Sequence, residues 1–152
     1  MSSPQRSNTL PSRNLSIASM NCHGLADYAK RRDVLHFLKT KQYSIYCLQD
    51  VHSAVHMEDR IRAEWGLDCY FSSFKSNARG VAILFNNNFE YKVFACNIDE
   101  NGNYLALSLE TQGYKITLIM VQINMTLIFM RRLTVLSRNM IIFIQLYVVT
   151  GI

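Results

Sequence analysis

The chain has 152 residues, the length of one ordinary domain, of which 49% are apolar and 18% charged. This composition excludes a wholly disordered polypeptide and is sufficient for a sizeable core. The formal net charge of +5 would fit an anionic partner such as nucleic acid, but it is unevenly placed. Residues 1–110 carry 12 basic and 11 acidic residues, a net of +1, whereas residues 111–152 carry four basic residues and no acid, a net of +4.

The first half of the chain predicts alternating strands and helices. Residues 1–14 are rich in Ser, Asn and Arg and hold both prolines, so we expect a disordered lead-in. Hydrophobic periodicity then predicts a strand, an amphipathic helix, a second strand and a second helix. These cover, in order, Leu15–Met20, Lys30–Thr40, Tyr43–Leu48 and Met57–Trp65.

The following segments are typical of strands only. They are Cys69–Phe74, Gly80–Phe85, Phe89–Ala95, Tyr104–Leu109 and Tyr114–Ile119, with turns at Asp99–Gly102 and Gln112–Gly113. A β-α-β-α order followed by a run of strands predicts an α/β domain.

Cysteine spacing and apolar runs limit the class of protein further. The four cysteines (Cys22, Cys47, Cys69 and Cys96) form no CxxC pair, which argues against a structural zinc site. No apolar leader follows Met1, so we expect an intracellular protein, in cytoplasm or nucleus, with reduced thiols that are buried or idle. The apolar runs Ile116–Met130 and Asn139–Val149 are too short or interrupted for a spanning helix, so we expect no stable membrane insertion.

Two polar residues each follow a predicted buried strand. Asn21 follows the first strand and Asp50 lies just after the second. In α/β sheets, ligands and metals gather beyond the carboxyl ends of strands, and a carboxylate there can hold a hard cation such as Mg²⁺. Asn and Asp are also common turn formers, so the residues alone leave both interpretations open.

Other candidates for chemistry are weaker. His52 and His56 are four residues apart, which would align them on one helix face, but no acidic residue lies between them and the segment before Met57 need not be helical. A solvated pair is the favoured interpretation. No Ser/His/Asp or Cys/His arrangement has a recognisable local signature.

Three passages between Leu15 and Ile119 carry a family resemblance: Ser19–Lys39 (SMNCHGLADYAKRRDVLHFLK), Tyr43–His52 (YSIYCLQDVH) and Ala78–Val93 (ARGVAILFNNNFEYKV). In this order they resemble the N-terminal half of an endonuclease/exonuclease/phosphatase domain, nearest to the endonuclease domains of LINE-type retrotransposons. The first looks like the family's opening strand, Asn-x-x-Gly-Leu loop and first helix, the second is similar to its "D-I-I-x-L-Q-E-T-H" segment, and the third to its "x-x-G-V-A-I-L" strand and hairpin.

The resemblance implies a four-layered α/β sandwich of the DNase I type that cleaves DNA phosphodiesters with a divalent metal, ancestrally Mg²⁺. Asn21 then takes the role of the active-site carboxamide, and Asp50 stands where the family has its metal-binding Glu. Asp is one methylene shorter, and metal sites tolerate small displacements poorly.

The family pattern stops at Ile119, where a Tyr-x-Pro-Asn loop and later a Gly-Asp-x-Asn strand end should follow. Reading the tail one nucleotide out of phase permits Tyr-Gly-Pro-Asn from Ile119 onward and Gly-Asp-Trp-Asn from Val148 to Ile152. Because Met has only one codon, its last base and the first two bases of the Val121 codon must read as Gly in the shifted frame. We therefore interpret Met120–Ile152 as a frameshifted translation, from a decayed element or an error in the gene model.

The sequence thus predicts a truncated, inactive endonuclease domain, with a non-catalytic scaffold whose apolar tail binds a membrane or partner as the alternative. We further expect residues 15–119 to supply one sheet with its helices and to leave the apolar face of that sheet bare. A bare apolar face predicts aggregation or chaperone binding.

Overall fold

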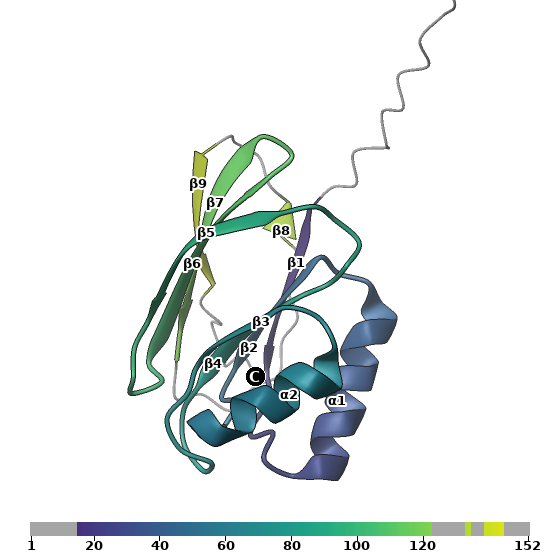
Figure 1. Cartoon of the computed structure of the whole chain (residues 1–152), viewed down its shortest axis with the longest axis vertical. Coiled ribbons are helices and arrows are strands. Elements are labelled where there is room, and N and C mark those ends of the chain that lie inside the picture. Colours follow the sequence, from purple (N-terminus) through teal and green to yellow (C-terminus); the bar gives the residue numbers. More distant parts are fainter. Residues whose placement is uncertain (1–14, 123–132, 135–138, 145–152) are drawn as a thin grey trace, which may run out of the picture.

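The computed structural model describes residues 15–122, 133–134 and 139–144 of the chain. Its elements form three layers: two helices, a mixed sheet behind them, and a second sheet behind the first (Figure 1). The predicted lead-in, residues 1–14, lies outside the described residues.

The first sheet has the strand order β3-β4-β2-β1-β8. Its strands are β1 (Ser16–Asn21), β2 (Ile45–Gln49), β3 (Cys69–Ser72), β4 (Val81–Phe85) and β8 (Leu133–Thr134). β1 and β2 are parallel, with Ile17 opposite Ile45 and Asn21 opposite Gln49, whereas the other pairs are antiparallel. The carboxyl ends of β1 and β2 therefore meet at one edge of the sheet.

Helices α1 (Tyr28–Lys41) and α2 (Glu58–Trp65), the latter preceded by a 3-10 turn η1 (Val55–Met57), cover one face of this sheet (Figure 1). The Asp27 carboxylate caps α1 by accepting the Lys30 amide at 2.8 Å. Trp65 is buried at the end of α2, and its indole Nε1 donates to the Phe85 carbonyl at 2.8 Å. This bond ties the helical layer to β4.

The other face of the first sheet is covered by a second sheet with the order β5-β6-β7-β9. Its strands are β5 (Lys92–Ile98), β6 (Tyr104–Thr111), β7 (Tyr114–Val121) and β9 (Asn139–Ile144). Leu105, Leu107 and Leu109 alternate inward from β6 and pack in one buried cluster with residues of the first sheet.

The expectation of a single sheet with a bare apolar face is therefore wrong. Period-2 alternation in β6 and β7 gives each strand one apolar face, and that face covers Ile17 and Ile45 of the first sheet. Aggregation stays a prediction; β5 is an edge strand on which Phe94 and Ile98 are exposed.

The predicted elements of residues 15–119 are all present, with one displaced. The strand expected at Phe89–Ala95 lies at Lys92–Ile98. Phe89 and Tyr91 instead pack their rings on Phe85 before the strand begins, and the register of β5 shifts between Val93 and Ala95. A bulge of this kind breaks the alternation from which a strand is predicted.

The segment interpreted as frameshifted lies partly outside the described residues, which include its positions 120–122, 133–134 and 139–144. β7 runs two residues past the predicted boundary, and β9 pairs with it in parallel. None of the described helices is long and apolar enough to cross a bilayer.

Candidate active site

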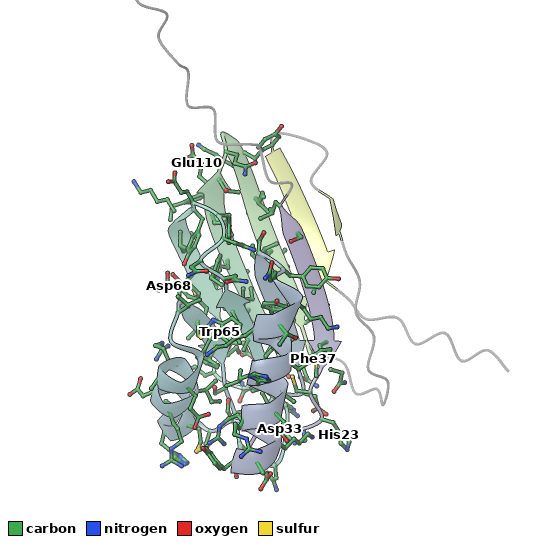
Figure 2. The ribbon with its side chains drawn as sticks, turned by 90° about the vertical axis from the view of Figure 1, so that its right-hand side faces the viewer. His23, Asp33, Phe37, Trp65, Asp68 and Glu110 are labelled. Carbon is green, nitrogen blue, oxygen red and sulfur yellow. The ribbon has the colours of Figure 1, made fainter. Side chains whose placement is uncertain are left out.

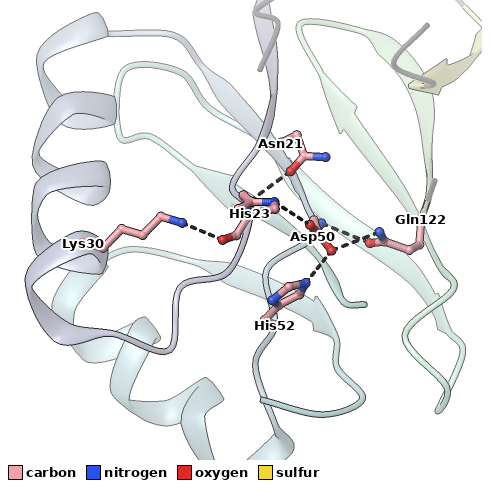
Figure 3. Close-up of polar contacts among 6 residues, drawn as sticks. All are labelled: Asn21, His23, Lys30, Asp50, His52 and Gln122. Carbon is pink, nitrogen blue, oxygen red and sulfur yellow. Dashed lines mark hydrogen bonds and ion pairs between the residues drawn. The ribbon is translucent and has the colours of Figure 1, made fainter. Parts of the chain in front are cut away.

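The candidate site lies at the edge where β1 and β2 end, and it brings the two predicted residues together (Figure 3). Asn21, the last residue of β1, is buried, and its Oδ1 accepts the His23 amide at 2.9 Å. Asp50 directly follows β2. His23 connects the two, since its Nδ1 lies 3.6 Å from Oδ2 of Asp50.

Asp50 adopts a left-handed backbone conformation, with φ of 54°. Its carbonyl accepts the Gly24 amide at 2.7 Å, and its own amide donates to Oε1 of Gln122 at 3.0 Å. These bonds hold the conformation that points the carboxylate across the edge toward the loop after β1. Such strained positions, which cost of order 1–3 kcal/mol, cluster at functional sites.

The Asp50 carboxylate is surrounded by nitrogen donors. Its Oδ1 lies 2.6 Å from Nε2 of His52 and 3.5 Å from Nε2 of Gln122. The side chain of Asp50 is 19% exposed and that of His52 22%, whereas His23 is 69% exposed. One oxygen of Asp50 is thus engaged inside the protein and the other faces a solvent-accessible imidazole.

The sequence does not single out either histidine as a partner of Asp50. His56 is exposed in η1, while His52 precedes every helical residue of that segment, so the two do not share a helix face. The usable signal is positional, because His23 and His52 each lie a few residues beyond one of two parallel strands. Parallel strands place such residues at the same edge.

A thiol nucleophile is excluded at this edge. Cys22 follows Asn21 and is buried, and burial raises the pKa of its thiol to about 12. A thiolate is therefore absent near neutral pH. All four cysteines are free; Cys22, Cys47 and Cys69 are buried and Cys96 is exposed.

The side chains at this edge fit a tightly held Mg²⁺ poorly. Mg²⁺ takes oxygen ligands in near-octahedral geometry, commonly one or two carboxylates plus waters. Here Asp50 is the carboxylate beside Asn21, and its Oδ1 already accepts hydrogen bonds. Among the residues the structure describes, no three His, Cys, Asp or Glu side chains are arranged to share a metal ion.

Comparison with solved structures identifies the architecture. The chain matches an apurinic-site (AP) endonuclease, LMAP, from Leishmania major with a TM-score of 0.56 and 19% identity, over 72% of this chain and 40% of that one. It matches a humanized D. rerio TDP2 with a TM-score of 0.57 and 17% identity, over 74% and 49% of the two chains. The human Nocturnin catalytic domain gives a TM-score of 0.51 and 16% identity, over 72% and 50%.

The chain has the DNase I-like fold. This is the fold of the endonuclease/exonuclease/phosphatase superfamily, so the resemblance predicted from the three sequence passages is confirmed. The described residues give three layers of that fold, two sheets and one helical layer. The chain spans between two fifths and one half of these solved structures.

One sequence relative of this DNase I-like chain is a transposon protein. It is the Transposon TX1 uncharacterized 149 kDa protein of Xenopus laevis, which is 28% identical over 99 residues. The match covers 65% of this chain and 8% of that protein. No family model matches the chain.

Proposed function

We propose that residues 15–119 descend from the N-terminal half of a retrotransposon-type endonuclease domain, a divalent-metal-dependent phosphodiester hydrolase that nicks DNA. The observation that supports this most is the junction of Asn21 and Asp50 through His23 at the edge where β1 and β2 end. In this proposal Asn21 is the ancestral active-site carboxamide and Asp50 the ancestral metal ligand.

We further propose that the 152-residue chain does not cleave DNA by itself. Metal-assisted phosphodiester cleavage needs a positioned metal, an activated water and stabilisation of the developing charge. Asn21 and Asp50 cannot supply all three, and Asp50 already shares Oδ1 with His52 and Gln122. The shorter Asp, in place of the family's Glu, supports the same conclusion.

A nicking assay tests both statements. The full chain and its Asp50→Ala variant are incubated with supercoiled DNA in Mg²⁺ and in EDTA. The fraction of plasmid converted to the relaxed circular form is then measured on an agarose gel. We expect equal, background nicking in all four reactions. Metal-dependent nicking by the wild-type chain that disappears in Asp50→Ala would overturn the inactivity and would support Asp50 as a metal ligand.

We also propose that Met120–Ile152 is translated out of frame, which accounts for a segment with no acidic residue. The nucleotide sequence tests this directly. Codons 119–152 read one base out of phase should give Tyr-Gly-Pro-Asn near the start and Gly-Asp-Trp-Asn at the end. If they do not, the tail is native to the chain and the interpretation is wrong.

A further inference from the structure

The loop between β3 and β4, residues 73–80, lies against the edge that carries Asp50. The carbonyl of Arg79 accepts the His52 amide at 2.8 Å, and the carbonyl of Gly80 accepts the Val51 amide at 3.0 Å. On its other side the Gly80 amide donates to the Gly102 carbonyl at 3.2 Å. The end of the loop is therefore fixed between the candidate site and the β5–β6 turn.

Two cations of this loop share one aromatic ring. Nζ of Lys75 lies 4.9 Å from the centroid of the Phe74 ring, and Cζ of Arg79 lies 5.0 Å from it. Cations within about 6 Å of a ring centroid are attracted by its π-electrons. Phe74 itself is half-buried, so it holds both charges close to the protein surface.

These two charges have no acidic partner among the described residues. Arg31, Arg32 and Arg62 each form an ion pair with a carboxylate, whereas neither Lys75 nor Arg79 does so within the part of the chain that the structure describes. Both side chains lie at the surface. Two like charges held near one ring without a counter-ion favour an anionic ligand.

We propose that Lys75 and Arg79 contact phosphates of the DNA backbone, with Phe74 as the support that orients them. The proposal rests on the proposed function for its ligand, since DNA is the ancestral substrate there. Lys presents a compact charge and Arg a fork that matches two phosphate oxygens, so the pair can engage neighbouring phosphates. The backbone bond from His52 to Arg79 places this contact next to Asp50.

Equilibrium binding without cleavage tests the proposal. The anisotropy of a fluorescein-labelled DNA duplex is titrated with the full chain in EDTA, at several salt concentrations between about 50 and 200 mM, the range over which phosphate contacts are resolved. The variants are K75A/R79A, the charge-conserving K75R/R79K, and a control that removes two cations elsewhere, K92A/K115A. Circular dichroism of each variant checks that it is folded.

The control is chosen by position. Lys92 and Lys115 are the register partners of Glu110 on either side of it, and both are exposed. Figure 2 shows Glu110 at the end of the molecule opposite His23. The control therefore removes the same charge far from the Asp50 edge.

K75A/R79A should weaken binding roughly tenfold and lower the slope of log K against log salt by about 2, because each of the two substitutions removes one phosphate interaction. K75R/R79K and K92A/K115A should keep the wild-type slope. The proposal is overturned if the wild-type chain does not bind the duplex, if K75A/R79A keeps the slope, or if the control lowers it equally.

The outcome is separable from that of the nicking assay. Binding in EDTA involves no metal and no cleavage, so the salt slope reports the phosphate contacts independently of any metal-dependent step. A chain that nicks DNA contradicts the proposed inactivity without changing the slope test. A chain that neither nicks nor shows the slope change contradicts the proposed role of Lys75 and Arg79 alone.

Discussion

Nε2 of His52 lies 2.6 Å from Oδ1 of Asp50, and its ring packs against Gly24 on the other side. A Cβ atom added at Gly24 would lie 2.9 Å from Nδ1 of His52. The imidazole is thus confined between a carboxylate from the end of β2 and the loop after β1. The two strand ends are connected by this side chain as well as by their backbone ladder.

Replacing His52 with Ala should destabilise the chain by about 1–2 kcal/mol, because the variant lacks a hydrogen bond to a charged, half-buried carboxylate. Urea unfolding measures the change. His56→Ala is the matched control, since His56 is exposed in η1 and forms no hydrogen bond or ion pair that the structure describes. Equal destabilisation of the two variants would contradict a role of the Asp50 contact in stability.

Much of this fold follows from patterns within single segments. The amphipathic periodicity of residues 28–41 predicts α1, and the continuous apolar run of residues 81–85 predicts β4, because each pattern reflects how that segment is buried. The positions of Asn21 and Asp50 just after two predicted strands also follow from the sequence, whereas their role in a site is implied by the family resemblance and stays a prediction. The local sequence predicts both kinds of feature without knowledge of the tertiary contacts.

The features that sequence patterns do not predict depend on contacts between distant segments. His23 and Asp50 are 27 positions apart, and nothing in either neighbourhood indicates that their side chains meet. Phe89 and Tyr91 fit a strand by alternation, but stacking on Phe85 holds them in the connection before β5. The strands of the second sheet are predicted, but their packing on the first sheet is not, because alternation shows that a strand has an apolar face without showing what lies against it.

An ion pair between a buried guanidinium and a half-buried carboxylate predicts acid sensitivity. Arg31 is buried, and its Nε and Nη2 donate to the two carboxylate oxygens of Glu64 at 2.6 and 2.9 Å. This hydrogen bonding lowers the pKa of Glu64 below its ordinary value of 4.5. The charged carboxylate therefore stabilises the fold above pH 4.5, and this contribution is lost as the pH falls from 4.5 through the lowered pKa.

Glu64→Gln should cost about 3 kcal/mol at pH 7, because it leaves the Arg31 charge without its counter-ion. The difference from wild type should shrink as the pH falls below 4.5. Urea unfolding at a series of pH values measures it. The control Asp59→Asn breaks an exposed ion pair with Arg62 and should change stability by less than about 1 kcal/mol. If the stability difference between Glu64→Gln and wild type does not change with pH, the ion pair with Arg31 is not the source of the acid sensitivity.

The thiols should differ sharply in reactivity. Burial raises the pKa of all four thiols, but Cys22, Cys47 and Cys69 are buried out of reach of a reagent, whereas Cys96 is exposed. A thiol reagent at about pH 8 should therefore modify one thiol in the folded chain and all four in denaturant. Cys96→Ser should abolish the reaction of the folded chain, whereas rapid modification of two or more thiols would contradict the described core.

Two glycines in the left-handed backbone conformation, Gly102 and Gly113, allow the cost of a steric clash to be measured apart from the cost of backbone strain. Gly102 has φ of 69°, and a Cβ there would lie 2.9 Å from Cβ of Phe74 and 3.1 Å from the Gly80 nitrogen. Gly113 has φ of 76°, and a Cβ there would meet nothing within 4 Å. The two positions share the strain of an L-residue, but Gly102 adds a clash with rigid backbone and with the base of the Phe74 side chain.

Gly113→Ala should cost about 1–2 kcal/mol from left-handed strain alone. Gly102→Ala should cost about 1–3 kcal/mol more, because the β5–β6 turn must move away from the 73–80 loop. Chemical unfolding of both variants gives the difference. Because that movement also displaces Phe74, Gly102→Ala should make the salt dependence of DNA binding less steep, whereas Gly113→Ala should leave it unchanged. Equal stabilities and equal salt slopes of the two variants would show that the β5–β6 turn does not support the 73–80 loop.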